Sequence, residues 1–381
     1  MYHATFRLAA AGALLGTLVH AAADSSTVWI GTTTPRGGAS KGIYGAAFDS
    51  ETGAISQPWL AAEMESPGFV ALHPNGRWLY STGRRPDGEG DVAAFEISGN
   101  GEEPAQLRFL NAQSTGDGGA AHLAVDKSGD WLFTAQYGGG SVALFPLDAE
   151  GRIGPRRQLV EHVGAGPDAR RQQSPHPHWV GVSPDNRFLM VPDLGIDKVV
   201  VYRFDAESGR IEPTGAGVCP PGGGPRHMKF HPNGRFVYVV NELQMSVTVF
   251  SWDAESGTLT PVQTISTLPD ALQEVPNTSS EIRVHPNGRF VYAANRGHDS
   301  IAAFRVDEEN GRLTFVEREA IRGSWPRNFN IDPSGKWLVA AGRDSATLAV
   351  FGIDQDAGNL RYTGKTVGCP SPICVEFQPR R

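Results

Sequence analysis

The chain has 381 residues, of which 46 are Gly and 27 are Pro, a content that disfavours long regular helices. With 40% hydrophobic and 20% charged residues it has the composition of a globular protein, which excludes a helical bundle, a coiled coil and a mainly disordered chain. The formal net charge is −7, with 34 Lys and Arg against 41 Asp and Glu and no basic run, so nucleic acid is excluded as the primary partner.

Residues 1–23 have the pattern of a secretory signal peptide. Arg7 precedes an apolar stretch from Leu8 to Val19, and three alanines stand before Asp24. A membrane anchor is the alternative, but this apolar stretch is shorter than the roughly 20 residues that a spanning helix needs. We therefore expect a mature domain over 24–381, exported to a bacterial periplasm and without a membrane span.

A pentapeptide, His-Pro-Asn-Gly-Arg in its clearest form, recurs along the chain. Its six copies, three of them weaker, start at His73, Asp126, Ser183, His231, His285 and Asp332. The intervals lie between 47 and 57 residues, a period typical of propeller blades. Each copy lies between two short runs of alternating β-formers, so we expect a hairpin turn there. Because the three histidines repeat in unlike blades, we expect them to be architectural.

A second turn, Asp-x-x-x-Gly, follows each pentapeptide and occurs seven times when two degenerate copies are counted. The missing seventh pentapeptide is explained by the chain ends. Residues 375–379 resemble a strand entering that turn, and residues 27–30 resemble the strand leaving it. We therefore predict an all-β fold, a seven-bladed β-propeller of four-stranded antiparallel blades with one blade closed by the N- and C-terminal strands.

The three cysteines, Cys219, Cys369 and Cys374, leave at least one thiol unpaired within a monomer. Two interpretations remain open. Either Cys369 and Cys374 bridge a proline-rich loop in an oxidising compartment, or all three are small buried hydrophobic residues. No Cys/His spacing suggests zinc, and no third histidine stands near His176 and His178, so we expect no metal site.

Charged side chains are predicted to gather at one mouth of the propeller. The start of each innermost strand and the loop after the second strand open on the same end, because these strands are antiparallel. Aligning the blades at both positions brings together seven polar residues: Arg84, His178, Arg226, Glu242, Arg296, Arg327 and Arg343. Guanidinium groups suit anionic or polyhydroxylated ligands and a developing oxyanion. The alternative is a set of structural ion pairs lining the channel.

Several motifs resemble the seven-bladed propeller lactonases, a family that includes 6-phosphogluconolactonases and the fungal carboxy-muconate lactonising enzyme. They are Ser-Pro-His-Pro-His at 174–178, Gly-Pro-Arg-His at 224–227, Asn-Glu at 241–242, Val-His-Pro at 284–286 and Asn-Arg at 295–296. The resemblance covers the whole mature chain and implies functional roles for His178, Arg226, Glu242 and Arg296. The candidate substrate-binding residues are His176, which motif matching cannot separate from His178, and Arg84, Arg327, Arg343, His227 and Asn241.

The resemblance implies a hydrolase whose partner is a small-molecule sugar lactone. Sugar phosphates are made inside the cell, so an exported protein is expected to open glucono-1,5-lactone to gluconate instead. In this hypothesis Arg226 and Arg296 hold the lactone, Glu242 orients or deprotonates water, and His178 protonates the leaving ring oxygen.

Two other functions remain open, a muconate-type cycloisomerase or lyase and a non-catalytic anion-binding propeller. A calcium-dependent enzyme is a variant of the lactonase hypothesis. The arginines expected around Glu242 would repel a dication, so we expect no cofactor. The sequence leaves the oligomeric state open.

Overall fold

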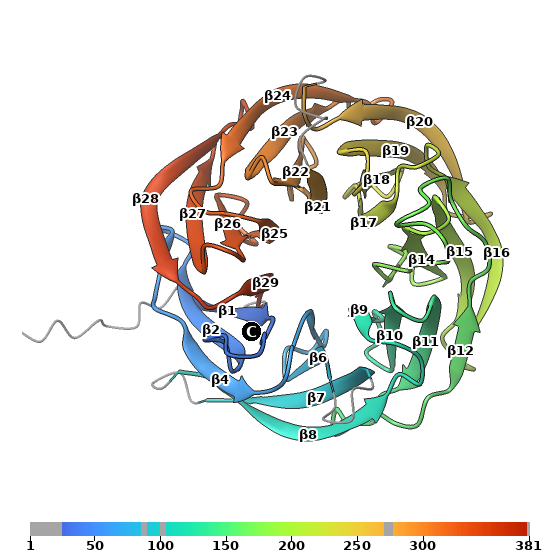
Figure 1. Cartoon of the computed structure of the whole chain (residues 1–381), viewed down its shortest axis with the longest axis horizontal. Coiled ribbons are helices and arrows are strands. Elements are labelled where there is room, and N and C mark those ends of the chain that lie inside the picture. The colour runs from blue at the N-terminus through green and yellow to red at the C-terminus, as the bar shows by residue number, and fades with distance from the viewer. Residues whose placement is uncertain (1–24, 85–89, 100–103, 270–276, 379–381) are drawn as a thin grey trace, which may run out of the picture.

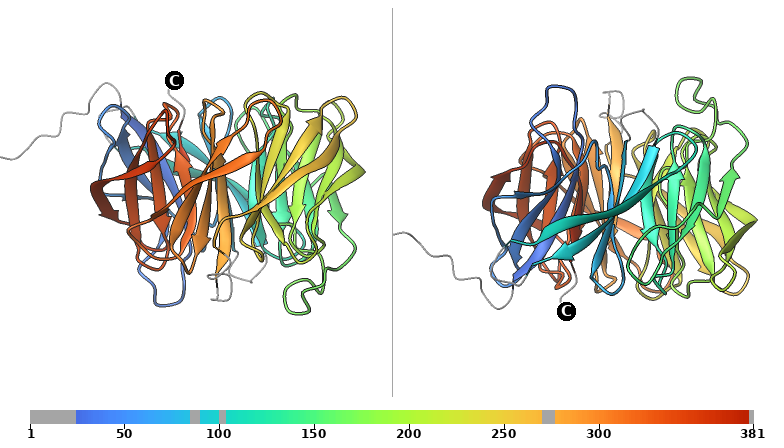
Figure 2. Two further views of the ribbon diagram at one scale, coloured as in Figure 1. Left: turned by 90° about the horizontal axis from the view of Figure 1, so that it is seen from above. Right: turned by 90° about the horizontal axis from the view of Figure 1, so that it is seen from below.

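The computed structural model describes residues 25–84, 90–99, 104–269 and 277–378, and 29 strands in these segments form seven antiparallel sheets. The sheets stand around a common axis like the blades of a propeller (Figure 1). Edge-on views show a flat disc whose thickness the strands cross (Figure 2). The predicted fold is confirmed. The predicted signal peptide lies outside the described residues.

From the axis outward, blade 1 contains β29 (Pro372–Phe377), β1 (Ser25–Thr32), β2 (Gly42–Asp49) and an outer strand in two pieces, β3 (Ala54–Ile55) and β4 (Trp59–Glu63). Blade 2 contains β5 (Val70–Leu72), β6 (Trp78–Arg84), β7 (Gly90–Ser98) and β8 (Gln106–Ser114). Blade 3 contains β9 (Ala120–Val125), β10 (Trp131–Gln136), β11 (Ser141–Pro146) and β12 (Gln158–Glu161). Blade 4 contains β13 (Gly181–Val182), β14 (Phe188–Asp193), β15 (Lys198–Asp205) and β16 (Arg210–Val218).

Blade 5 contains β17 (Pro225–Phe230), β18 (Phe236–Asn241), β19 (Ser246–Asp253) and β20 (Thr258–Ser266). Blade 6 contains β21 (Thr278–Val284), β22 (Phe290–Arg296), β23 (Ser300–Val306) and β24 (Leu313–Ala320). Blade 7 contains β25 (Pro326–Ile331), β26 (Trp337–Gly342), β27 (Thr347–Ile353) and β28 (Leu360–Gly368).

The two ends of the chain close the ring within blade 1. Strand β1 pairs antiparallel with β29, and Val28 lies opposite Phe377. The indole of Trp337, in the last blade, donates a 2.8 Å hydrogen bond to the carbonyl of Ser50 in the first blade. The split blade predicted from the termini is therefore confirmed, and pairing removes the two bare edges that an open ring would leave.

The hydrophobic core lies between neighbouring blades. One cluster of buried side chains joins Tyr238 and Val247 of blade 5 to Val291 and Phe304 of blade 6. The turn histidines link blades in the same way, because Nε2 of His231 lies 2.8 Å from the carbonyl oxygen of Gly288 in the next blade. His73 and His285 make equivalent contacts with Gly129 and Gly335. Their predicted architectural role is confirmed.

The three cysteines, all within the described residues, are buried and unpaired. The alternative of a bridge between Cys369 and Cys374 is therefore wrong, because both thiols are packed among side chains of the core. The described segments contain no helix with the length and apolar character needed to cross a membrane.

Candidate active site

A cavity of about 580 Å³ lies at the mouth of the ring where the inner strands begin. Ten residues line this active-site cavity: Ala121, Tyr137, Arg171, His178, Glu242, Asn277, Thr278, Arg296, Trp325 and Arg327. Three arginines and a histidine thus accompany Glu242, the single carboxylate among these ten lining residues. The cavity therefore suits an anion or a centre where negative charge develops.

The inner strands carry β-bulges at the positions that face this mouth. In blade 5, Pro225 pairs with Asn241 and His227 pairs with Val240, which leaves Arg226 unpaired between them. In blade 7 the same irregularity leaves Arg327 between two paired residues. A bulge bends the strand and re-aims a side chain, and bulges are over-represented next to functional sites. The bulges thus accompany an Arg327 that lines the cavity and a fully buried Arg226 that contacts Glu242 without being among the lining residues.

Glu242 lies at the centre of a cluster of guanidinium groups. Its backbone N–H donates to the carbonyl of Gly224, a residue with φ of 64° that turns the chain into β17. Its Oε1 accepts from Nη2 of Arg171 at 2.7 Å. Its Oε2 lies 3.0 Å from Nε of Arg226 and 2.9 Å from Nη2 of Arg296. Both carboxylate oxygens are therefore already engaged by arginines.

The surroundings of Glu242 and His178 fix their charge states. Burial alone would raise the pKa of Glu242, but Arg296 and Arg226 outweigh burial and hold that pKa well below its usual range. Burial, and after it Arg226, lowers the pKa of the His178 imidazole well below its usual value. At neutral pH the cavity therefore presents an ionised carboxylate next to a neutral imidazole.

Several buried polar atoms at this site lack a protein partner within the described part of the chain. They are Nδ1 of His178, Nη2 of Arg226, Nε of Arg296 and Nε of Arg327. A buried donor without a hydrogen bond costs roughly 1–3 kcal/mol, and such groups collect at functional sites. Bound water or a ligand oxygen is a suitable partner for the three guanidinium donors, and the tautomer of His178 decides whether its Nδ1 donates or accepts.

Arg171 was not predicted from the sequence. It lies on the long connection between β12 and β13, and its Nη2 also lies 3.2 Å from the hydroxyl of Tyr137. The neighbouring Gln172 is fully buried and donates to the carbonyl of Leu194 and to Oδ1 of Asp197. Asp197 accepts in turn from the backbone N–H of Gly224. This anchoring ties the Arg171 loop to the turn that precedes Arg226.

Trp325 is the second residue that sequence reasoning missed. The guanidinium carbon of Arg296 lies 5.7 Å from the centroid of the Trp325 ring, and the guanidinium carbon of Arg343 lies 5.4 Å from it. Such cation–π contacts stabilise charged groups that water no longer covers. Arg343 therefore reaches the cavity wall through Trp325, although it is not among the lining residues.

The structure places the other predicted residues away from the cavity lining. His176 stacks on Tyr137, with ring centroids 4.5 Å apart, and its Nδ1 lies 2.7 Å from the carbonyl oxygen of the same residue. His227 is fully buried, and its Nδ1 lies 3.1 Å from Oε2 of Glu281. Asn241 donates to two hydroxyl groups of its own blade. For Arg84 the structure describes the end of β6 and not the side chain.

In the residues that the structure describes, no three His, Cys, Asp or Glu side chains are grouped as a metal ion requires. Glu242 is surrounded by three guanidinium groups, which would repel a dication. This donor set offers hydrogen bonding, charge stabilisation and proton transfer.

Comparisons with known proteins give one consistent result. A family model described as lactonase, 7-bladed β-propeller, matches residues 27–377. A 6-phosphogluconolactonase of Bacillus subtilis is 38% identical over 349 residues, which cover 92% of this chain and 97% of that relative. A 6-phosphogluconolactonase of Formosa agariphila is 31% identical over 301 residues, covering 76% and 82%. The solved structure of a periplasmic gluconolactonase of Pseudomonas aeruginosa superposes with a TM-score of 0.86 at 31% identity, covering 93% and 99%.

Proposed function

Since the chain belongs to the seven-bladed β-propeller lactonase family, we propose that it hydrolyses glucono-1,5-lactone to gluconate in the periplasm. The observation that carries the proposal is the contact of Glu242 with three arginines beside a neutral His178. A lactone carbonyl gains negative charge as water attacks it, and the buried guanidinium N–H groups supply donors for that charge.

The charge states favour a division of roles that differs from the sequence-based hypothesis. A carboxylate whose two oxygens accept from three guanidinium groups is a weak base, so Glu242 fixes Arg226 and Arg296 in place. His178 is neutral, so unlike Glu242 its imidazole has a nitrogen lone pair that can accept a proton from the attacking water, and its lowered pKa favours prompt return of that proton.

The proposed step is balanced within the cavity. Water forms a C–O bond to the lactone carbonyl while its proton passes to His178. The ring C–O bond then breaks and the imidazolium returns the proton to the departing ring oxygen. The carboxylic acid so formed loses its proton to the solvent, and the arginines that line the cavity, Arg171, Arg296 and Arg327, hold first the oxyanion and then the product carboxylate.

Export is supported by residues 1–23, with their single arginine and apolar stretch, and by the periplasmic gluconolactonase among the structural relatives. Fractionation of cells that express the full chain, beside a variant lacking residues 1–23, tests this part. Recovery of both forms in the cytoplasm would contradict export.

The activity is tested by titrating acid release from fresh glucono-1,5-lactone at constant pH, against the spontaneous rate. A parallel assay uses the 6-phosphorylated lactone, and both are repeated with a chelator. We expect acceleration with the neutral lactone that the chelator leaves unchanged. Acceleration with the phosphorylated lactone alone would contradict the substrate, and no acceleration with either would contradict hydrolysis of these sugar lactones.

A further inference from the structure

A second cavity, of about 460 Å³, lies within the ring on the side of the first turns. Its lining includes His73 and Pro74 of the first turn of blade 2, together with residues from the innermost segments of all seven blades. It shares no lining residue with the active-site cavity. These two cavities are therefore separate, one toward each mouth.

Small residues on one side of the axis make room for the second cavity. Two positions before the first turn, blades 2, 3 and 4 carry Ala71, Ala124 and Gly181. The other four blades carry larger polar residues at this position: Lys229, Arg283, Asn330 and Glu376. The indole of Trp179 packs against Gly181, where an added Cβ would lie 2.2 Å from the ring. The rings of Phe69, His122 and Trp179 thereby form an aromatic wall.

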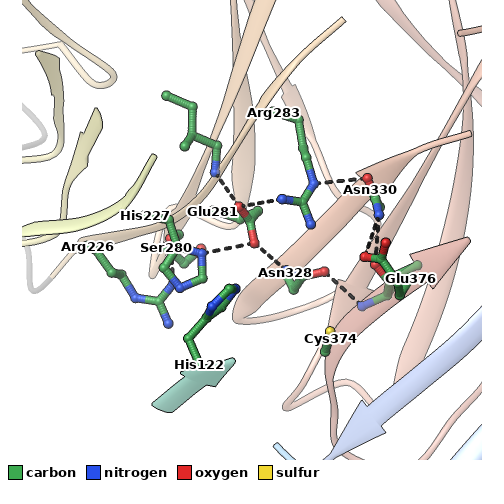
Figure 3. Close-up of polar contacts among 12 residues, drawn as sticks. His122, Arg226, His227, Ser280, Glu281, Arg283, Asn328, Asn330, Cys374 and Glu376 are labelled. Atoms are coloured by element: carbon green, nitrogen blue, oxygen red, sulfur yellow. Dashed lines mark hydrogen bonds and ion pairs between the residues drawn. The ribbon is translucent and has the colours of Figure 1, made fainter. Parts of the chain in front are cut away.

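The opposite wall is polar and held in place (Figure 3). Arg283 donates through Nε to Oδ1 of Asn330 at 2.9 Å and through Nη1 to Oε1 of Glu281 at 3.1 Å. Asn330 donates to Oε2 of Glu376 at 3.3 Å. The ammonium of Lys229 lies 5.0 Å from the centroid of Trp179 and so joins the polar wall to the aromatic one.

The charges of this cluster balance. Lys229 and Arg283 face Glu281 and Glu376, two cations for two carboxylates. Burial raises the pKa of Glu376 and lowers the pKa of Lys229 to about 8, and both shifts reduce the charge further. A charged ligand would leave one of these groups uncompensated, whereas the active-site cavity has an excess of arginines.

The aromatic wall contains one buried polar group, the indole N–H of Trp179, without a hydrogen-bond partner among the described residues. Trp179 is 7% exposed, and its Nε1–H makes no hydrogen bond within the described residues. Buried indole N–H groups usually find an acceptor. The side chains that line the second cavity therefore include one whose buried N–H is left without an acceptor by the described residues.

We propose that the second cavity binds a neutral sugar ring. A pyranose has an apolar C–H face that covers an aromatic wall, and an edge of hydroxyl groups that both donate and accept. Arg283 and Lys229 donate to these hydroxyls while Glu376 accepts from them. The volume lies within the range of small-molecule sites. This inference does not depend on the proposed lactonase activity.

Calorimetric titration of the purified protein with D-glucose, D-galactose and D-mannose, and with gluconate as the anionic comparison, tests the proposal. Ala124→Leu fills the cavity from the small-residue side, and Lys229→Met removes the ammonium while keeping the length of the side chain. Lys198→Met, at an exposed lysine, is the matched control. Glu242→Gln reports on binding in the active-site cavity. Thermal unfolding shows which variants fold, and either cavity variant alone is sufficient.

We expect a neutral sugar to bind, with affinity weakened by about tenfold or more in Ala124→Leu and Lys229→Met and unchanged in Lys198→Met and Glu242→Gln. Three results would overturn the proposal. They are no binding of any of the three sugars, binding that only Glu242→Gln weakens, and binding of gluconate but not of neutral sugars at the site that Ala124→Leu blocks.

Discussion

Arg226 and Glu242 form an ion pair with side chains 0% and 5% exposed and 3.0 Å between Nε and Oε2. Arg226 lies at the start of β17 and Glu242 directly after β18, so the hairpin brings both to the same mouth of the ring. Breaking a buried pair from one side leaves an uncompensated charge and typically costs about 3–5 kcal/mol. The site is therefore rigid before any ligand arrives.

The lowered pKa values of His178 and Glu242 predict the pH dependence of kcat/KM. The pKa of His178 is held well below its usual value by burial and Arg226, and the pKa of Glu242 is also depressed. His178 therefore gains its proton at a lower pH than an ordinary histidine, which is half protonated at about pH 6.5. We therefore predict that kcat/KM for the lactone shows no loss with a midpoint at about pH 6.5 as the pH falls from neutrality. A loss of kcat/KM with a midpoint near 6.5 would contradict the assignment of a neutral His178.

The hydrogen bonds of Glu281, beside the second cavity, are predicted to stabilise the ring. Glu281 is fully buried and bonds to His227, Arg283 and Asn328, which lie on three blades (Figure 3). Glu281→Leu leaves the Arg283 guanidinium without this carboxylate and two buried polar groups without their partner, and we expect it to lower the free energy of unfolding by about 3–5 kcal/mol. Glu51→Leu removes the partner of an exposed lysine and is the control. Urea denaturation compares the two variants. Equal free energies of unfolding for Glu281→Leu and Glu51→Leu would contradict the stabilising role of Glu281.

Five of the predicted site residues were brought together as the sequence indicated. His178, Arg226, Glu242, Arg296 and Arg327 were found because hairpins of nearly constant length place equivalent positions of each blade at one mouth. Aligning the sequence repeats therefore predicts those site residues that stand at equivalent positions of the blades.

The remaining site residues depend on features that the repeat does not encode. Arg171 and Trp325 lie on connections between blades, where length and conformation vary and blade alignment gives no register. His227 was assigned to the substrate from its motif, but it follows the bulged Arg226 and points deeper into the ring. A one-residue bulge decides this orientation, and nothing in the alternation of β-formers indicates one.

Closure of the ring makes a specific steric prediction. Gly53 has φ of 64°, and an added Cβ would lie 2.7 Å from the ring of Trp337 in the last blade. Gly234 has a similar φ of 70° and nothing within 4 Å of an added Cβ. Gly53→Ala and Gly234→Ala therefore carry the same backbone strain, and only the first overpacks the closing contact, for about 1–3 kcal/mol more. Thermal unfolding measures the difference, and equal destabilisation would contradict tight closure at this contact.

The thiols give a simple test of the packing. All three cysteines are buried, and burial raises the pKa of Cys369 and of Cys374 to about 12. We expect none of them to react with a thiol reagent in the native protein and all three to react after unfolding without reductant. A single reactive thiol after unfolding would indicate a disulfide and contradict the structure.

In the proposed function, the cavity around Glu242 performs lactone hydrolysis. The most direct measurement is kcat for acid release at saturating glucono-1,5-lactone in the wild type, in Glu242→Gln and in Glu207→Gln, an exposed control. Glu242→Gln removes the charge that orients Arg226 and Arg296, so we predict a loss of about 10²-fold or more in kcat, with Glu207→Gln at the wild-type rate. Wild-type kcat in Glu242→Gln would contradict the account.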